Sequence, residues 1–310
     1  MPDSPPNYSV ATLCEGDYDL GVAAMINSLC RIGYSGKVVV GYRGRRPRLP
    51  GELEYRHGSI NSNIQVECVL IDWQWHLGNF KARFMIDQIE RDDSPCDGII
   101  YVDPDIVFRA SWAFFVDWVL SGVAVCSDPK YFRMSINDPK RKKWQNLCLQ
   151  MNFAFREMSG YVNSGFVGVD RRYAAILHAW MALDAQLFES GQHDRDILVS
   201  REVGAPFEYA DQDVLNMALH TVDVPVTLAG LEGMGFDGSG SYYMSHAFGR
   251  RKPWRGGFIR DALRHGFRPS RAARDFWEHA DQPIAVFPKR RIRLMKAEIK
   301  TAVVLSRLLS

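Results

Sequence analysis

Apolar residues recur along the chain with two periods, one typical of strands and one typical of helices. Short apolar runs of the strand type cover Tyr8–Leu13, Lys37–Tyr42, Ile64–Ile71, Gly98–Val102, Gly122–Cys126 and Gly165–Val169. Between them, helical spacing of apolar residues covers Tyr18–Ile32, Lys81–Ile89, Trp112–Leu120 and Arg172–Phe188. Several of the strands are wholly apolar and so need cover on both faces. The alternation therefore predicts an α/β fold, with a mixed, mostly parallel sheet flanked by helices.

The composition is that of a folded protein with reduced cysteines. Of the 310 residues, 46% are hydrophobic, which excludes a disordered polymer. The six cysteines form no Cys-x-x-Cys pair, which argues against a zinc knuckle or a disulfide framework. The N-terminus lacks the basic and apolar segments of an export signal, and no run approaches the roughly 20 apolar residues of a spanning helix. We therefore expect a cytoplasmic protein, in contact with the membrane at most at its inner surface.

The formal net charge of +2 combines two unlike regions. Residues 1–249 contain 22 Lys+Arg and 31 Asp+Glu, a net charge of −9, whereas residues 250–310 contain 16 and 5, a net charge of +11. An acidic body with a basic end indicates that the end meets something anionic.

Two carboxylates, Asp103 and Asp105, follow directly after the apolar run Gly98–Val102. Residues two apart in extended chain point to the same side, and Pro104 between them discourages helix. Ligands of α/β sheets gather at the carboxyl ends of strands. Two like charges this close repel unless a cation or a proton lies between them, and hard oxygen ligands suit Mg²⁺ or Mn²⁺. Three other Asp-x-Asp pairs occur in the chain, so the strand-end position, rather than the spacing, favours a metal site here.

Three later segments complete a recognisable order. They are Asn163-Ser164-Gly165, Asp211-Gln212-Asp213-Val214-Leu215-Asn216 and His246-Ala247-Phe248-Gly249-Arg250-Arg251-Lys252-Pro253-Trp254. With the aspartate pair, this series resembles glycosyltransferase family 8, which includes glycogenin and the lipooligosaccharide galactosyltransferases, over a region from about Tyr8 to Trp254. Its most specific piece is the His-x-x-Gly-x-x-Lys-Pro-Trp block. The resemblance implies a GT-A fold, a nucleotide-sugar donor (commonly UDP-linked), Mn²⁺ and retention of the anomeric configuration.

The resemblance also implies roles for individual residues. Asp103, Asp105 and His246 match the metal ligands, and Gly249 and Lys252 match diphosphate contacts. The other donor-binding positions are Arg83 facing phosphates, Ala11, Thr12 and Leu13 at the nucleotide edge, Tyr18 on the uracil, Pro104 within the metal motif, and Asp128, Asn163 and Ser164 near the sugar. Asp211 would bind the same sugar, and Gln212 would lie beside the anomeric carbon.

Some positions depart from the family pattern or allow a structural interpretation. Pro104 replaces the common Ala or Ile, and the stretch from Asp128 to Tyr161, with its basic Lys140–Lys143 cluster, has no obvious counterpart and is a candidate acceptor-specific region. Tyr18 is alternatively a helix-start aromatic packed on the sheet, and Asp128 a strand-end cap. The Asn-Ser-Gly segment is alternatively a tight turn into a strand.

We expect a GT-A catalytic domain over residues 1–257 and a basic, aromatic helical extension over residues 258–310. From residue 289 onward the extension holds seven Lys+Arg and one Glu, with apolar Ile292, Met295, Ile299 and Val303 at helical spacing. This pattern is typical of an interfacial helix on anionic lipid. The alternative is a helix whose apolar face packs on the catalytic body.

The leading hypothesis is a Mn²⁺-dependent retaining hexosyltransferase that uses UDP-glucose or UDP-galactose and a cell-envelope glycan or lipid-linked acceptor. We expect front-face attack, because Gln212 is a poor nucleophile, ahead of double displacement through Asp211. A nucleic-acid-binding protein is the first alternative, but the acidic body argues against it and no nucleic-acid partner is expected. The second is an inactive GT-A relative acting as a scaffold, which the intact Asp103, Asp105 and His246 disfavour.

Overall fold

The first part of the fold is a mixed sheet whose central strands are buried along their whole length. Its strands are β1 (Tyr8–Glu15), β5 (Gly98–Val102), β8 (Val162–Asp170), β7 (Val123–Ser127) and β9 (Val226–Ala229), in the spatial order given. β1 pairs with β5, and β7 with β9, in parallel, whereas β8 pairs with both β5 and β7 in antiparallel fashion. Every residue of β5, β7 and β8 is buried. The predicted α/β class with a mixed sheet is confirmed.

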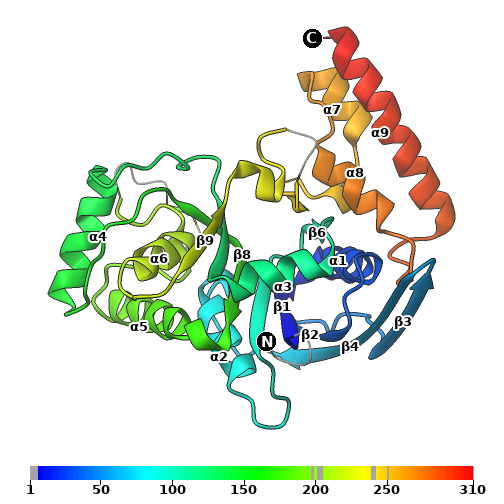
Figure 1. Ribbon diagram of the computed structural model, residues 1–310. Coiled ribbons are helices and arrows are strands. Elements are labelled where there is room, and N and C mark those ends of the chain that lie inside the picture. The colour runs from blue at the N-terminus through cyan, green and yellow to red at the C-terminus, as the bar shows by residue number, and fades with distance from the viewer. Residues whose placement is uncertain (1–5, 197–198, 201–204, 239–241, 250, 310) are drawn as a thin grey trace. The chain divides into compact units, whose positions relative to one another are not determined.

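The computed structural model (Figure 1) describes residues 6–196, 199–200, 205–238, 242–249 and 251–309. The first five residues, which bear on the expected lack of an export signal, and Arg250 of the His block lie outside the described residues. The chain divides into two units. The first comprises Met1–Leu13, Val69–Val102 and Ala113–Leu231, and the second Cys14–Cys68, Asp103–Trp112 and Glu232–Ser310.

The helices of the first unit lie against this sheet. They are α2 (Lys81–Ile89), α3 (Trp112–Leu120), α4 (Pro139–Gln150), α5 (Ala175–Glu189) and α6 (Ala210–Leu219). α5 packs against both α2 and α6, α2 contacts β5, and α6 contacts β8 (Figure 1). α3 contacts β8 through Trp118, whose ring is stacked on that of Phe166 with centroids 5.1 Å apart. The sequence pattern did not predict α4, which is largely basic, or α6, which is buried on all sides and so shows no apolar face.

The second unit contains two small groups of strands. β2 (Gly36–Arg43), β4 (Ile60–Leu70) and β3 (Glu52–His57) are neighbours, with β3 and β4 forming an antiparallel hairpin. β6 (Ile106–Phe108) and β10 (Met244–His246) form a separate antiparallel pair. The strand predicted at Ile64–Ile71 therefore begins earlier, at Ile60. Its partner β3 was missed because Leu53 is its one buried side chain.

Four helices of the second unit enclose an aromatic core. They are α1 (Asp19–Arg31), α7 (Phe258–His265), α8 (Arg271–Glu278) and α9 (Lys289–Leu309). Trp254, Phe276 and Trp277 lie at the centre, and the Trp277 indole N–H donates to the Pro253 carbonyl at 3.1 Å. Ile292 and Ile299 of α9 are buried in the same core. Part of the apolar face that was expected to meet lipid is thus covered by protein, since α9 packs on α7 and α8 (Figure 1). No helix among the described residues is both long enough and apolar enough to cross a membrane.

A close approach at Gly21 of α1 fixes the turn that carries the aspartate pair. A Cβ atom built on Gly21 would overlap the Pro104 carbonyl oxygen and lie 2.9 Å from Cζ3 of Trp254. Neither neighbour moves easily, because one is backbone and the other is a core indole that is 2% exposed. The turn from Asp103 to Asp105 therefore rests directly on a helix backbone that has no side chain at this point.

We predict that Gly21→Ala lowers the free energy of unfolding by about 1–3 kcal/mol, as overpacking does, although helix propensity alone favours Ala by about 1 kcal/mol. Gly51→Ala is the matched control, since a Cβ there meets nothing within 4 Å, and should change stability by less than about 0.5 kcal/mol. Urea unfolding of the three proteins measures both effects. A Gly21→Ala protein as stable as the wild type would contradict the close packing.

Candidate functional site

Asp103, Asp105 and His246 come together because β6 pairs with β10. The aspartates lie in the turn between β5 and β6, which is closed by a hydrogen bond from the Ile106 N–H to the Asp103 carbonyl at 3.1 Å. His246 is the partner of Ile106 in the β6–β10 register. The Ala247 N–H then donates to the Asp105 carbonyl at 3.0 Å. Backbone pairing therefore places the histidine beside the second aspartate.

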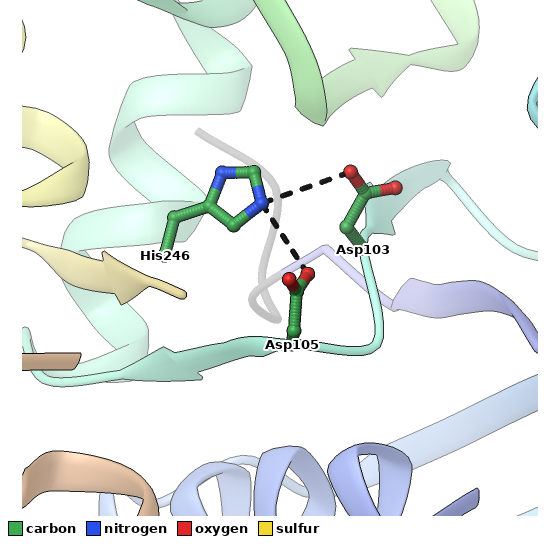
Figure 2. A group of neighbouring side chains, drawn as sticks. All are labelled: Asp103, Asp105 and His246. Carbon is green, nitrogen blue, oxygen red and sulfur yellow. Dashed lines mark ion pairs between the residues drawn. The ribbon is translucent and has the colours of Figure 1, made fainter. Parts of the chain in front are cut away.

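The three side chains offer one nitrogen and two oxygen ligands to a common point. Nε2 of His246 lies 3.3 Å from Oδ1 of Asp105 and 3.9 Å from Oδ2 of Asp103, and Figure 2 shows one edge of the imidazole facing both carboxylates. One ligand atom from each residue lies within 4.8 Å of the others. Carboxylates with an imidazole suit divalent ions such as Mn²⁺ or Mg²⁺. The donor set fits the metal that the sequence predicts.

A buried cation, Lys252, completes the electrostatics of this cluster. Its Nζ donates to Oδ2 of Asp105 at 2.5 Å and to the Ala247 carbonyl at 3.1 Å. Burial alone would raise the pKa of Asp105, but His246 and Lys252 outweigh it and lower this pKa to about 2. Burial would likewise lower the pKa of Lys252, but Asp105 more than compensates and raises it. Both groups are therefore charged at neutral pH.

The other predicted residues of the His block have distinct environments. Gly249 has a φ of +97°, and a Cβ atom built there would meet nothing within 4 Å, which leaves room for a phosphate to approach the backbone. Tyr18 is half-buried and meets the edge of Trp254, with ring centroids 5.3 Å apart. Lys252 Nζ lies 5.5 Å from the Tyr18 ring centroid. Tyr18 thus packs on Trp254 of the helical core rather than on the sheet, and its contact with a base stays a prediction.

The sugar-binding candidates form a second, hydrogen-bonded cluster within the first unit. Gln212 is held at both ends of its amide: Oε1 accepts from the Ser164 N–H at 3.1 Å, and Nε2 donates to Oδ2 of Asp128 at 3.2 Å. Nδ2 of Asn163 donates to the same Asp128 oxygen at 3.0 Å. The Ser164 hydroxyl donates to Oδ2 of Asp211 at 2.8 Å. The structure therefore brings all five predicted residues together, and Asn163 and Ser164 lie within β8 rather than in a turn before it.

Lys81 is the basic residue of this cluster. The sequence resemblance named Arg83 as the functional basic residue of this segment and did not identify Lys81. Its Nζ lies 2.8 Å from Oδ2 of Asp211 and donates to the Ser164 hydroxyl at 3.2 Å. Burial alone would raise the pKa of Asp211, but Lys81 outweighs it and lowers this pKa. Arg83, the predicted phosphate contact, is exposed and pairs with Asp87 one turn along α2 at 2.8 Å, and its contact with phosphates stays a prediction. The sequence could have indicated Lys81 through helical periodicity, because residues 81, 82, 84 and 85 of α2 are buried and Arg83 lies between them on the exposed side.

A chain of polar contacts through Tyr161, Asp213 and Lys140 holds the Gln212 amide in its orientation. The Tyr161 hydroxyl accepts from Nε2 of Gln212 at 3.1 Å and donates to Oδ1 of Asp213 at 2.6 Å. Lys140 Nζ lies 2.8 Å from the other oxygen of Asp213. Burial raises the pKa of Asp213 despite this lysine. Lys140 and the fully buried Trp144 are thus internal supports, whereas the acceptor-specific role expected of the stretch from Asp128 to Tyr161 stays a prediction.

Two other segments that were predicted to bind the donor lie in β1 and in the aspartate turn. Ala11, Thr12 and Leu13 are buried in β1, and the Thr12 hydroxyl has no hydrogen-bond partner within the described parts of the chain. Pro104 lies at the centre of the turn that presents the two aspartates and contributes its carbonyl to the contact with α1. Their contacts with a nucleotide stay predictions.

No protein-family model and no curated protein matches the chain. Among solved structures, it is similar to the apo structure of WbbM, a bifunctional glycosyltransferase, with a TM-score of 0.51 and 15% sequence identity. The match covers 96% of this chain and 53% of that one, so the chain spans about half the length of its structural neighbour. At this identity the similarity establishes the fold alone. The chain has a glycosyltransferase-like α/β fold.

Proposed function

We propose that this protein is a metal-dependent retaining glycosyltransferase. It moves a hexose from a UDP-sugar, UDP-glucose or UDP-galactose, to a hydroxyl of a cell-envelope glycan or lipid-linked acceptor. One observation carries the proposal: Asp103, Asp105 and His246 offer ligand atoms that lie within 4.8 Å of one another, in a chain with a glycosyltransferase-like fold. The UDP-sugar and the preference for Mn²⁺ rest on the resemblance of the His block to family 8.

The metal cluster supplies what a glycosyl–diphosphate leaving group needs. Mn²⁺ or Mg²⁺ bound there would stabilise the negative charge that develops on the diphosphate. Asp103, Asp105 and His246 would hold the ion, and Asp105 is ionised for this purpose because its pKa is about 2. Lys252 keeps a full positive charge beside Asp105. We assign the Lys252 ammonium and the exposed Gly249 backbone to the phosphates.

The cluster in the first unit fits a site for sugar hydroxyls. Asp128, Asn163 and Asp211 are buried and already held in place, because Asn163 donates to Asp128 and the Ser164 hydroxyl donates to Asp211, so binding requires little reorganisation. Lys81 and Ser164 stabilise the charge of Asp211 and thereby weaken it as a nucleophile. An amide such as Gln212 is a poorer nucleophile still. This supports attack by the acceptor hydroxyl on the leaving-group face, with the diphosphate taking the proton.

We predict Mn²⁺-dependent hydrolysis of UDP-glucose or UDP-galactose by the wild-type protein in the absence of acceptor. Asp105→Asn should lower kcat/KM by about 100-fold or more, the size of effect seen when a preorganised charge stabiliser is lost. Asp103→Asn, at a position with 24% side-chain exposure, tests the same point with less risk to folding.

Asp196→Asn is the matched control, because Asp196 belongs to an Asp-x-Asp pair and is exposed. It should leave hydrolysis unchanged. Hydrolysis that is equal with and without Mn²⁺, or equal in Asp105→Asn, Asp103→Asn and wild type, would overturn the proposed role of the cluster.

We predict that no sugar becomes attached to Asp211 during turnover. Intact mass spectrometry of protein incubated with donor and Mn²⁺ should show the unmodified chain, and Gln212→Ala should lower kcat by about tenfold without producing an adduct. A hexose adduct mapped to Asp211 would establish double displacement instead.

The C-terminal helix retains an exposed apolar set that supports contact with anionic lipid. Leu294, Val304, Leu308 and Leu309 of α9 are all exposed, Leu308 to 76%, and the helix carries seven Lys+Arg. Exposed leucines among cations fit a bilayer surface with anionic headgroups. We therefore propose peripheral association of this end of α9 with the inner face of the cytoplasmic membrane.

Leu308→Ser combined with Leu309→Ser should weaken co-sedimentation with phosphatidylglycerol vesicles by about tenfold. Removing the whole helix is not a suitable test, because Ile292, Ile299 and Ala302 belong to the core of the second unit. Leu70→Ser, at a leucine with 65% exposure outside α9, is the control. Equal sedimentation of both variants and wild type would remove the membrane proposal.

A further inference from the structure

Six residues of the first unit are joined by hydrogen bonds into a closed ring. In order around the ring, they are Asp128, Lys130, Glu208, Asp213, Tyr161 and Gln212. The ring closes where Nε2 of Gln212 donates to Oδ2 of Asp128 at 3.2 Å. A polar network whose members are all hydrogen-bonded stabilises one arrangement of its side chains. This ring therefore fixes two residues of the sugar-binding cluster, Asp128 and Gln212, from both sides.

The inner part of the ring is buried and holds the Gln212 amide. Gln212, Tyr161 and Asp213 are all buried side chains. Oδ1 of Asp213 accepts from the Tyr161 hydroxyl at 2.6 Å, and Oδ2 accepts from the backbone N–H of Glu208 at 2.6 Å. The Tyr209 N–H donates to the same Oδ2 at 2.9 Å. Asp213 thus connects the residues that precede α6 to the Gln212 side chain within it.

The Glu208 carboxylate closes the outer part of the ring. One of its oxygens accepts from Lys130 Nζ, and the other accepts from the Tyr131 hydroxyl. The Lys130 backbone N–H in turn donates to Oδ1 of Asp128 at 2.9 Å, while Oδ2 of Asp128 accepts from Gln212. A single carboxylate therefore ties the segment that follows Asp128 to the segment that precedes α6.

Charge and aromatic contacts stabilise this closure at neutral pH. Burial alone would raise the pKa of Glu208, but hydrogen bonds from Lys130 and Tyr131 outweigh it and lower this pKa. The same carboxylate raises the pKa of Lys130. The Lys130 ammonium also lies 5.1 and 5.2 Å from the ring centroids of Tyr131 and Tyr209. With side-chain exposures of 47% for Lys130 and 24% for Glu208, this ion pair is the most exposed link of the ring, because the other four members are buried.

We propose that Glu208 is a positioning residue of the sugar-binding cluster. It acts through its neighbours, since Lys130 orients the Asp128 carboxylate, and Asp213 orients the Gln212 amide through Tyr161. That this cluster receives a sugar rests on the proposed function, whereas the closed ring does not. Groups that are already ordered bind a ligand without a further entropic cost. Loss of the Glu208 carboxylate should therefore weaken contacts with the hexose, and it should not affect the diphosphate contacts, because none of the residues proposed to make them belongs to the ring.

Comparing a UDP-hexose with UDP isolates this effect. Glu208→Ala should lower kcat/KM for Mn²⁺-dependent hydrolysis of UDP-glucose or UDP-galactose, whichever the wild type hydrolyses faster, by about tenfold, which corresponds to about 1.4 kcal/mol. The inhibition constant of UDP, which lacks the hexose, should stay unchanged. Glu208→Gln keeps an oxygen acceptor at this position and should lie between Glu208→Ala and wild type.

Asp223→Ala is the matched control. Asp223 also forms an ion pair with partly exposed side chains in the first unit, with Arg156, but it is not a member of the ring. Its removal should leave both kcat/KM and the inhibition by UDP unchanged. A purely structural role of Glu208 would lower stability to urea without changing the preference for UDP-hexose over UDP. Equal kcat/KM in Glu208→Ala, Asp223→Ala and wild type, or an equal loss of affinity for UDP, overturns the inference.

Hydrogen exchange of the Gln212 side-chain amide, measured by NMR on the free protein, separates this inference from the proposed function. Exchange should be slow in wild type and in Asp223→Ala, and faster in Glu208→Ala because the ring is open. Faster exchange in a protein whose wild type hydrolyses neither donor would remove the transferase and leave Glu208 as the residue that positions Gln212. Unchanged exchange in a protein that hydrolyses the donor would remove the positioning role and leave the transferase.

Discussion

The antiparallel pairing of β6 with β10 is the interaction on which the candidate metal cluster depends. Each strand has three residues, yet together they join the aspartate turn to a histidine far along the sequence. The register places His246 opposite Ile106, next to Asp105. Because Gly21 has no side chain, α1 packs directly against the turn at Pro104. Trp254, the last residue of the His block, is buried in the core of the second unit. The ligand geometry is thus a consequence of backbone pairing and core packing.

In both units, buried carboxylates lie next to lysine side chains. In the second unit, Asp105 faces both Lys252 and His246, so its carboxylate stays ionised and can exchange a lysine contact for a cation. In the first unit, the Lys81 ammonium lies 2.8 Å from Asp211, and the Lys140 ammonium lies 2.8 Å from Asp213. All three carboxylates are buried, and each lies 2.5–2.8 Å from a lysine ammonium.

The sequence was informative wherever local chemistry decides the structure. Wholly apolar runs predicted β5 and β7. The aspartate pair at a strand end and the resemblance of the His block together pointed to the three residues of the candidate metal cluster. Long-range packing was less visible. β10 and β6 are too short to show a period, and α6 is buried on every side. Lys81 and Arg83 differ by less than one helical turn, and only the direction of α2 against the sheet decides which of them reaches Asp211.

Pulsed electron paramagnetic resonance of bound Mn²⁺ tests the central claim, that Asp103, Asp105 and His246 together hold the divalent ion that meets the donor diphosphate. We predict a nitrogen hyperfine coupling that disappears in His246→Gln, and a phosphorus coupling that appears when UDP is added to the wild-type protein. A Mn²⁺ signal without nitrogen coupling, or a nitrogen coupling that persists in His246→Gln, would contradict the account.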